Sequence, residues 1–420
     1  MLTAATPAEQ HAAAERDPLR VLIVGAGIAG VTLAGLLRRQ GLHPVLLERA
    51  EERSVHAGYM LALMPMVDPV LDELSAHERY RSASVPFDRY RIRSHTGRLL
   101  RDDSMGSVLA RYGDYRGLDR ASLIEVLSTG GVPVAFGTTV SALHEHEDGI
   151  RATITGDALE QELEFDVVVI ADGMHSRTRA LALRGRGVQT VDTGWGGWVA
   201  WAPADDDPGR GEELWGDGFF VGSYPVPGRI GVFVGGPNDE TAAGPGAFVA
   251  RIRAGLRHDA PRIDAALDAV ATADEPYYWP MADCRAGTWR AGRAVLLGDA
   301  AAGFMPTAGI GAGMAMESAG VLAAALRGAR PAEVPDRLAE YERRQRPRVE
   351  SAQDNSRALA RLMFRRGRLF AALRDAAARV VSVGVALGPI RRLLETAPAP
   401  LARTTPEGRP VSEEGRSRSR

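Results

Sequence analysis

The sequence contains no lysine and only one cysteine, Cys284. All 51 basic residues are therefore arginine, and chemistry that needs a lysine amine, such as Schiff-base formation, is excluded. The single cysteine excludes an intramolecular disulfide, a Cys-rich zinc site and a CxxC redox pair. We therefore expect no metal site, and nothing in the sequence requires an oxidising compartment.

The sequence also lacks a long apolar run. The best candidate, 380–390, is bounded by arginines and falls short of the roughly 20 apolar residues that a membrane span needs. Residues 1–20 lack the continuous apolar core of a signal peptide. These absences predict a cytoplasmic protein without an integral membrane segment.

Neither sign of charge dominates, because 51 basic and 53 acidic residues leave a formal net charge of −2. A chain balanced in this way has no strong field to hold a polyanion, so we expect no nucleic-acid partner. Of the 420 residues, 45% are apolar and 25% are charged, which is typical of a globular protein with two or three domains.

Short apolar runs predict buried parallel strands. Residues 20–25 form such a run, a helix is expected over 28–40, and a second strand follows at 44–48. This βαβ unit predicts an α/β, doubly wound domain. Segments 165–171 and 293–298 have the same strand character and end in Gly/Asp turns.

The composition and residue pattern change between these two later strands. Residues 195–279 combine aromatic residues, glycines and short alternating runs such as 229–235, which predicts an inserted antiparallel sheet. After Gly313 the sequence becomes helical, first to about residue 327, then over 334–346 and on to 394. We therefore expect a smaller second domain, followed by C-terminal helices.

A glycine motif joins the first strand to the first helix. Gly25 permits a tight turn, Gly27 lets a pyrophosphate approach the backbone, and Gly30 lets the helix pack closely on the sheet. Glu48 ends the second strand, where a carboxylate accepts hydrogen bonds from ribose hydroxyls. This spacing predicts a dinucleotide site at the positive end of the helix.

Two later motifs accompany the glycine motif: an Asp172-Gly173 motif that runs to Arg179, and Gly298-Asp299 followed by a glycine-rich loop to Gly313. With these three motifs in order, about the first 330 residues resemble the para-hydroxybenzoate hydroxylase-like family, the single-component FAD-dependent aromatic monooxygenases. The resemblance implies an FAD-binding, Rossmann-type doubly wound domain with an inserted, mainly antiparallel β substrate domain and C-terminal helices.

The resemblance also implies how FAD is held. Asp299 would accept hydrogen bonds from the ribityl chain, and the helix after it would direct its first amides at the flavin. The cofactor-binding residues added in this way are Arg49, Arg120, Asp172, Asp299, Gly311 and Ala312. Asp172 and Arg179 would in addition shape the passage of the nicotinamide cofactor. No second GxGxxG follows a strand, and in the resembled family NAD(P)H docks in a groove as co-substrate.

The inserted sheet forms the roof of the substrate cavity in that family. The expected lining residues are Tyr59, Trp201, Phe220, Tyr224, Met305 and Pro306. Many relatives have a histidine where this chain has Ala302, so no imidazole acts at that position. No catalytic residue is assigned from the sequence.

The resemblance implies an FAD-dependent, NAD(P)H-consuming monooxygenase that acts through a flavin C4a-hydroperoxide. It would hydroxylate or epoxidise an electron-rich, aromatic or polycyclic small molecule with O2. Two alternatives stay open: a flavin-dependent dehydrogenase or reductase, and a non-catalytic FAD-bound accessory protein. A flavin-dependent halogenase is excluded because those enzymes depend on an active-site lysine.

The expected domain order combines these elements. A disordered lead-in covers 1–18, FAD-binding segments cover 19–75, 101–184 and 285–330, substrate-domain segments cover 76–100 and 185–284, C-terminal helices cover 331–397, and a disordered tail covers 398–420. The arginine-rich stretch 357–394 is interpreted as helices packed on the FAD domain, with peripheral membrane contact as the alternative. The protein is expected to be a monomer or a homodimer.

Overall fold

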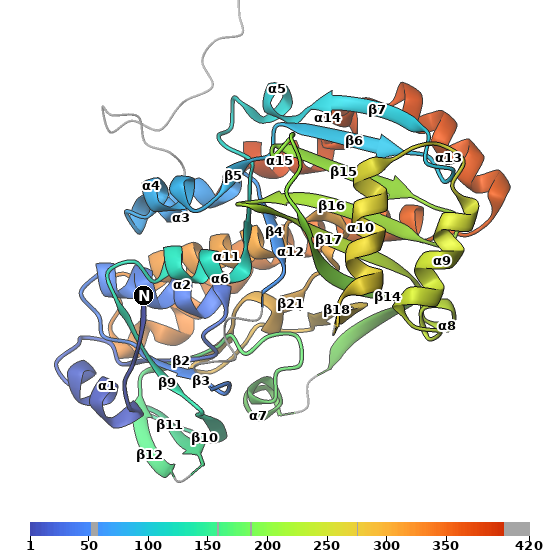
Figure 1. The fold of residues 1–420 in the computed structure, drawn as a ribbon. Helices are drawn as coiled ribbons and strands as arrows, with labels where there is room; N and C mark the ends of the chain where they lie inside the picture. Colours follow the sequence, from blue (N-terminus) through green and yellow to red (C-terminus); the bar gives the residue numbers. More distant parts are fainter. Residues whose placement is uncertain (52–57, 158, 185–186, 275, 399–420) are drawn as a thin grey trace, which may run out of the picture.

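The computed structural model describes residues 1–51, 58–157, 159–184, 187–274 and 276–398. Two large sheets organise these residues, and helices lie against each of them (Figure 1). The predicted tail at 398–420 falls, apart from residue 398, outside the described residues.

The first sheet has seven strands. In spatial order they are β1 (Leu2–Ala4), β9 (Val132–Phe136), β3 (Val45–Glu48), β2 (Val21–Val24), β13 (Val167–Ile170), β20 (Ala294–Leu296) and β19 (Arg290–Ala291). All neighbours pair in parallel except β19 and β20. Every residue of β2 and β13 is buried, as expected for parallel strands covered on both faces. Helices α2 (Ile28–Arg39) and α11 (Gly311–Leu326) pack on each other beside this sheet. The predicted doubly wound α/β domain is confirmed.

Residues 1–18 are not the disordered lead-in that their composition predicts. Strand β1 extends the parallel sheet at the edge of β9, and helix α1 (Pro7–Ala14) follows it. A capping box between Thr6 and Glu9 begins this helix, and the Gln10 side chain hydrogen-bonds to the backbone of β3. The segment is ordered because its backbone pairs with a distant strand, which the composition of the segment alone does not reveal.

The second sheet has eight strands and forms most of the inserted domain. In spatial order they are β21 (Ala302–Gly303), β18 (Tyr277–Ala286), β14 (Val188–Pro203), β17 (Arg229–Pro237), β16 (Phe220–Val226), β15 (Arg210–Trp215), β6 (Arg89–Arg93) and β7 (Leu99–Ser104). The pairing is antiparallel except between β15 and β6. The predicted segment 76–100 is displaced, because β7 continues to Ser104 and Tyr80 belongs to the core of the FAD domain.

Smaller elements extend the domain built on the seven-stranded sheet, connect it to the eight-stranded sheet or lie beside the latter. A meander of β10 (Thr139–His146), β11 (Gly149–Gly156) and β12 (Leu159–Phe165) was not predicted. A second three-stranded sheet, called the small sheet below, contains β4 (Met60–Leu63), β8 (Arg116–Asp119) and β5 (Val85–Pro86). The short helices are α3 (Asp68–Glu73), α4 (His77–Ser82), α5 (Met105–Leu109), α6 (Arg120–Leu127), α7 (Thr178–Leu183) and α8 (Asn238–Thr241). The small sheet lies close to β16 at Gly117. A Cβ at this residue would lie only 1.9 Å from the Pro225 carbonyl oxygen, so the close approach requires glycine.

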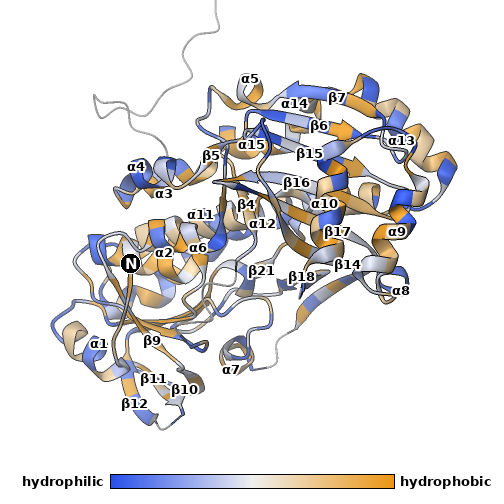
Figure 2. Cartoon of the chain, viewed as in Figure 1, coloured by the Kyte–Doolittle hydropathy of each residue, from blue (hydrophilic) through white to orange (hydrophobic). Residues whose placement is uncertain are grey.

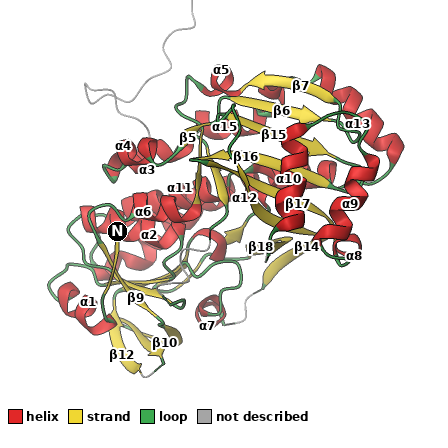
Figure 3. Cartoon of the chain, viewed as in Figure 1, coloured by secondary structure: helices red, strands yellow, loops and turns green. Residues whose placement is uncertain are grey.

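Helices α9 (Pro245–Gly255) and α10 (Pro261–Thr272) cover one face of the eight-stranded sheet (Figure 3). The buried apolar residues of α10 are Ile263, Ala266, Leu267 and Val270, a helical spacing that turns one stripe toward the strands. Hydrophobic and hydrophilic residues accordingly alternate along α10 (Figure 2). The opposite face of the sheet is left to line a cavity.

The C-terminal helices are α12 (Val334–Met363), α13 (Arg368–Val380), α14 (Val383–Ala386) and α15 (Gly388–Glu395). Buried or part-buried arginines fasten them: Arg348 donates to both oxygens of Glu317 at 2.7 and 2.9 Å, and Arg357 donates to both oxygens of Asp283 at 2.7 and 2.8 Å. The predicted helices are confirmed, but the expectation that 357–394 packs on the FAD domain is wrong for α13. This helix packs on β7 at the edge of the eight-stranded sheet, and Arg374 donates to the Gly216 carbonyl at 2.9 Å. Among the described helices, none combines the length and apolar character that crossing a bilayer requires.

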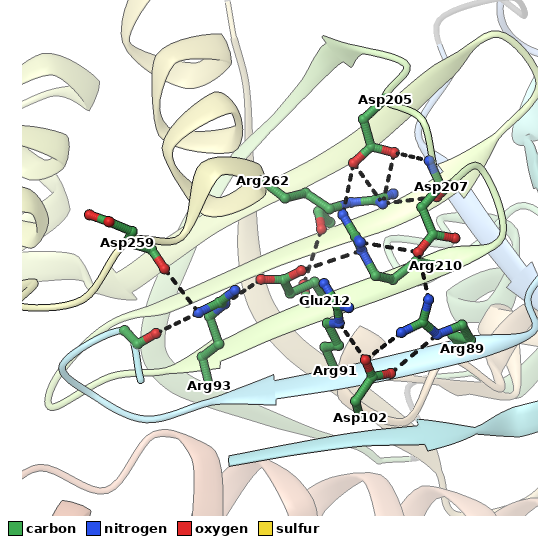
Figure 4. Close-up of polar contacts among 12 residues, drawn as sticks. Arg89, Arg91, Arg93, Asp102, Asp205, Asp207, Arg210, Glu212, Asp259 and Arg262 are labelled. Atoms are coloured by element: carbon green, nitrogen blue, oxygen red, sulfur yellow. Dashed lines mark hydrogen bonds and ion pairs between the residues drawn. The ribbon is translucent and has the colours of Figure 1, made fainter. Parts of the chain in front are cut away.

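A buried network of charges lies beneath α10 (Figure 4). Arg93 of β6 pairs with Glu212 of β15, and Arg210 contacts Glu212 at 3.5 Å. Arg262 reaches down from α10 to Asp205 at 3.1 Å. The network therefore ties the parallel pair β15–β6 to the covering helix, with Glu212 at its centre.

We predict that Glu212→Ala lowers the free energy of unfolding by about 3–5 kcal/mol, because it leaves the buried Arg93 guanidinium without its counterion. Asp268→Ala is the matched control, since its ion pair with Arg253 is exposed and should cost about 0.5 kcal/mol or less. Urea unfolding followed by fluorescence measures both changes. Equal effects of the two substitutions would contradict the assignment.

Candidate cofactor and substrate site

A cavity of 840 Å³ is lined by both large sheets and by the small sheet. One part is bounded by the carboxyl ends of β2, β3 and β13 and by the start of α11. The other part is bounded by the roof strands β14 to β18 and by the end of α12. A ligand that spans the cavity would therefore contact both domains.

The glycine motif builds the first wall of the cavity. Gly25 has φ +107°, and a Cβ there would lie 2.5 Å from the Ala171 carbonyl oxygen. At Gly30 a Cβ would lie 1.9 Å from the Gly25 carbonyl oxygen, so the first turn of α2 can touch the end of β2. Gly27 differs: a Cβ there would meet no atom within 4 Å, and the residue lines the cavity.

Two helix N-termini border the cavity. Helix α2 begins at the Gly27 cap and α11 at the Ile310 cap, and neither cap offers a side-chain acceptor. Gly311 and Ala312 of α11 line the cavity directly. Helix N-termini carry unpaired amides and the positive end of the helix dipole, so both favour a negatively charged ligand group.

Glu48 lies at the end of β3 and lines the cavity. One carboxylate oxygen accepts from the Ala26 amide and the other from the Ala50 amide, each at 2.9 Å. These bonds hold the carboxylate beside the glycine motif, and each oxygen keeps a second lone pair for a ligand hydroxyl. Arg49, the next residue, is exposed and also lines the cavity.

The Asp172-Gly173 motif contributes a hydrogen-bond acceptor to the cavity, and Arg179 at its end contributes hydrogen bonds to neighbouring backbone. Asp172 Oδ2 accepts from the Thr178 amide at 3.3 Å, whereas its buried Oδ1 has no hydrogen-bond partner within the described chain and is free to accept from a ligand. Arg179 does not line the cavity. It donates to the carbonyl oxygens of Ala300 at 2.7 Å and Met174 at 3.0 Å, so it locks the Asp172 motif onto the Asp299 turn.

Asp299, Tyr59 and Arg120 all line the cavity, and Tyr59 interacts electrostatically with the other two. The surrounding protein raises the pKa of Asp299 to about 6, although its side chain is exposed to the cavity. Burial, with a smaller contribution from Asp299, raises the pKa of Tyr59 to about 12. Arg120 begins α6, donates its backbone amide to the Tyr59 carbonyl at 3.0 Å and hydrogen-bonds the Tyr59 phenol.

The donor and acceptor set fits FAD. The uncapped helix N-termini suit the pyrophosphate, the Glu48 carboxylate suits ribose hydroxyls, and the open face of Gly27 lets a phosphate approach the backbone. The orphaned Asp172 oxygen and the Asp299 carboxylate offer acceptors to the hydroxyl groups of the cofactor.

Comparisons with known proteins agree with this site. The family model described as FAD binding domain matches residues 18–356. The 3-amino-4-hydroxybenzoate 2-monooxygenase PtnB3 of Streptomyces platensis is 30% identical over 361 residues, which cover 80% of this chain and 87% of that protein. The chain therefore belongs to the FAD binding domain family, as the sequence resemblance predicted, and FAD is its cofactor.

Other similarities are shorter or concern the fold alone. The FAD-dependent monooxygenase pyr5 of Aspergillus fumigatus is 30% identical over 166 residues, which cover 39% of this chain but only 35% of that protein. The chain thus matches about a third of the length of such relatives. The structure of Klebsiella pneumoniae HpxO with FAD and uric acid has a TM-score of 0.79 and 23% identity, covering 90% of this chain and 97% of that one.

The predicted substrate residues divide between two cavities. Tyr59, Phe220, Tyr224, Met305 and Pro306 line the main cavity. Trp201 instead lines a second cavity of 830 Å³, and the Arg229 guanidinium lies 3.6 Å from the centre of its ring. Tyr59, Arg120 and Val199 line both cavities, so they separate Trp201 from the main one.

Several lining residues were missed from the sequence. They include Tyr90, His175, Arg177, Glu213, Phe233 and Trp279. Glu213 is the least expected, because acidic residues are rarely buried and this one is only 8% exposed. The adjacent pair Glu212-Glu213 could have indicated it. Neighbouring residues on a strand point to opposite faces of the sheet, so one of the two must point toward the cavity face of the roof.

We predict that Gly27→Val folds normally but weakens FAD binding by at least about tenfold, since losing about 1.4 kcal/mol of phosphate contact costs that factor. A Cβ at this position meets no protein atom within 4 Å, and the residue lines the cavity, so the added methyl groups would occupy ligand space. Gly246→Val is the control, because that site on α9 is equally open and far from the cavity lining. Flavin fluorescence titration and thermal melts of the apoprotein measure the two effects. Normal FAD affinity in Gly27→Val would contradict the assignment of this site.

We predict that FAD affinity falls as pH drops through about 6, because only ionised Asp299 accepts hydrogen bonds from ribityl hydroxyls on both oxygens. The folded apoprotein holds the Asp299 proton up to a higher pH than the unfolded chain. Asp299 therefore favours the folded apoprotein below pH about 4, and this contribution is lost as pH rises to about 6. FAD binding works in the opposite direction and strengthens over the same range.

Asp299→Asn should weaken FAD binding about tenfold at pH 8, since hydrogen bonds to a charged group contribute about 1.5–3 kcal/mol. It should also flatten the pH dependence between about 5 and 7, the range around the Asp299 pKa. Dissociation constants measured by flavin fluorescence across this range provide the test. A variant that keeps the wild-type slope would show that another group titrates.

Proposed function

We propose that the chain is a monooxygenase that uses FAD, NAD(P)H and O2 to oxygenate an electron-rich small molecule, with hydroxyarenes as the preferred class. The observation that carries this proposal is the single cavity, in which an FAD cradle and an aromatic chamber are continuous. A flavin at the Asp299 turn would face Met305 and Pro306, and an aromatic ring would fit among Phe220, Tyr224 and Tyr59.

FAD, when bound, supplies oxygen activation and the two-electron chemistry. The residues of this chain position it and shape its surroundings. The N-terminus of α11 stabilises negative charge on the flavin without a charged side chain. The apolar side chains of Val199, Phe233 and Met281 line the chamber and would disfavour bulk water beside the reacting groups.

The overall reaction balances as follows. Substrate, O2, NAD(P)H and a proton give the oxygenated product, NAD(P)⁺ and water, so one oxygen atom enters the product and the other is reduced. The sequence carries no second glycine motif after a strand, which favours docking of NAD(P)H on the surface of this chain over binding in a separate Rossmann domain.

The relatives support the same activity. PtnB3 is named as a monooxygenase of 3-amino-4-hydroxybenzoate, an arene that carries a hydroxyl and an amine, and pyr5 is named as an FAD-dependent monooxygenase. The aromatic chamber of this chain suits such a ring. The missing lysine disfavours halogenation by a lysine-dependent route.

We predict that the FAD-loaded protein incorporates one atom of ¹⁸O from ¹⁸O2 into a hydroxyarene while it consumes NADH or NADPH. A panel that includes 3-amino-4-hydroxybenzoate and 2-naphthol, analysed by mass spectrometry, provides the measurement. At FAD concentrations that just saturate the wild type, Gly27→Val should form less product, in proportion to its lower FAD occupancy. Consumption of NAD(P)H with hydrogen peroxide as the sole oxygen product, across the whole panel, would favour a dehydrogenase instead.

A further inference from the structure

Glu213 is a carboxylate in the roof of the chamber, and strand geometry explains its direction. Glu212 and Glu213 are neighbours on β15, so their side chains leave the sheet on opposite faces. Glu212 enters the charge network beneath α10 (Figure 4). Glu213 lines the main cavity on the other face, together with Trp215 of the same strand.

Glu213 differs from the other buried carboxylates in having no cationic partner. The other buried acidic residues each form an ion pair with an arginine or a histidine: Asp68, Asp166, Glu212, Asp283, Glu317 and Asp375. Across the part of the chain that the structure describes, no such pair is found for Glu213. Burial raises the pKa of Glu213, whereas hydrogen bonds from Tyr90, Trp215 and Tyr224 favour the ionised form and oppose that shift. Burying a carboxylate without a counterion is costly, so a ligand that donates a further hydrogen bond would stabilise the ionised form.

Neutral donors hold the Glu213 carboxylate in place. Trp215 Nε1 donates to one oxygen and the Tyr224 hydroxyl to the other, both at 2.8 Å, and the Tyr90 hydroxyl is a third partner. Burial raises the pKa values of Tyr90 and Tyr224 well above the usual range, so both phenols stay protonated as donors. A carboxylate accepts about four hydrogen bonds, so three donors leave one acceptor position.

The surroundings define what that position can bind. Tyr224 and Trp215 direct their polar hydrogens at Glu213, so they present no donor to the cavity. Phe220, Phe233 and Met281 make the neighbouring wall apolar. The roof therefore offers a substrate one oriented hydrogen-bond acceptor in an apolar chamber. This arrangement favours binding of a group that donates a hydroxyl hydrogen and disfavours binding of an anion.

We infer that Glu213 accepts a hydrogen bond from the ring hydroxyl of the arene substrate and thereby selects hydroxyarenes over arenes that carry an anionic group at that position. The inference rests on the proposed function, whose arene substrate it specifies. Tyr224, Trp215 and Tyr90 act as positioning residues, because they orient the carboxylate that contacts the substrate. Electron density at the ring rises when its hydroxyl donates to a carboxylate, which favours oxygenation of that ring.

The test measures how two probes bind to the oxidised, FAD-bound protein. The probes have similar shapes, but one is a neutral hydroxyl donor and the other is an anion. The probes are 2-naphthol and 2-naphthoate, and perturbation of the flavin spectrum reports their dissociation constants. Glu213→Gln keeps the volume of the side chain and removes its charge. We expect 2-naphthol to bind about tenfold more weakly to this variant, and 2-naphthoate to bind several-fold more tightly.

Met281→Leu is the matched control, since it changes the same chamber without changing its charge, and it should leave the ratio of the two dissociation constants unchanged. A purely structural role for Glu213 would move both probes in the same direction. Any pattern in Glu213→Gln other than opposite shifts of the two probes overturns the inference. The experiment needs neither NAD(P)H nor O2, so its outcome does not depend on whether the protein is a monooxygenase.

Discussion

The architecture depends on a contact between backbones where β2 ends and α2 begins. A side chain at Gly30 would overlap the Gly25 carbonyl, and one at Gly25 would overlap the Ala171 carbonyl at the end of β13. Because neither side chain exists, β2, α2 and β13 converge at one edge of the sheet. That convergence brings Glu48, Asp172 and the open face of Gly27 to the same cavity. The FAD cradle is thus a consequence of close packing, and its specific acceptors are added at the ends of strands that packing has already positioned.

In the roof, the alternation of side chains along a strand determines which residues face the cavity. On β15, Glu212 and Glu213 have the same chemistry but opposite surroundings: a network of arginines on the helix-covered face and an apolar chamber on the other (Figure 4). The first carboxylate is matched by arginines, whereas the second is held by neutral donors where a ligand can reach it. One strand therefore serves stability and recognition at once. A register shift of one residue would exchange these roles and lose both.

The sequence predicted features that depend on local spacing and missed those that depend on distant pairing. Gly25, Gly27, Gly30 and Glu48 were found because a strand, a turn and a helix are contiguous in sequence. Asp299 was found because the Gly298-Asp299 motif in the turn after a predicted strand resembles that of a known family. Strand β1 was missed because its order comes from pairing with β9, more than a hundred residues away in sequence. Trp201 was predicted in the substrate chamber, but strand periodicity defines a face and not a position along it, and the residue lies in the neighbouring cavity. Glu213 was missed because burial of an acidic residue is a property of the assembled roof.

The two ends of the cavity differ in their charges and hydrogen-bonding groups. At the end expected to hold the cofactor, two helix N-termini favour an anionic group, while Glu48, Asp172 and Asp299 offer carboxylate oxygens that can accept from hydroxyl groups. At the roof, a carboxylate held by neutral donors faces an apolar space. An anionic molecule is therefore attracted at one end and repelled at the other, whereas a neutral ring with a hydroxyl group is favoured at the roof. The same cavity can in this way hold a dianionic cofactor in one orientation and keep its anionic groups away from the substrate position.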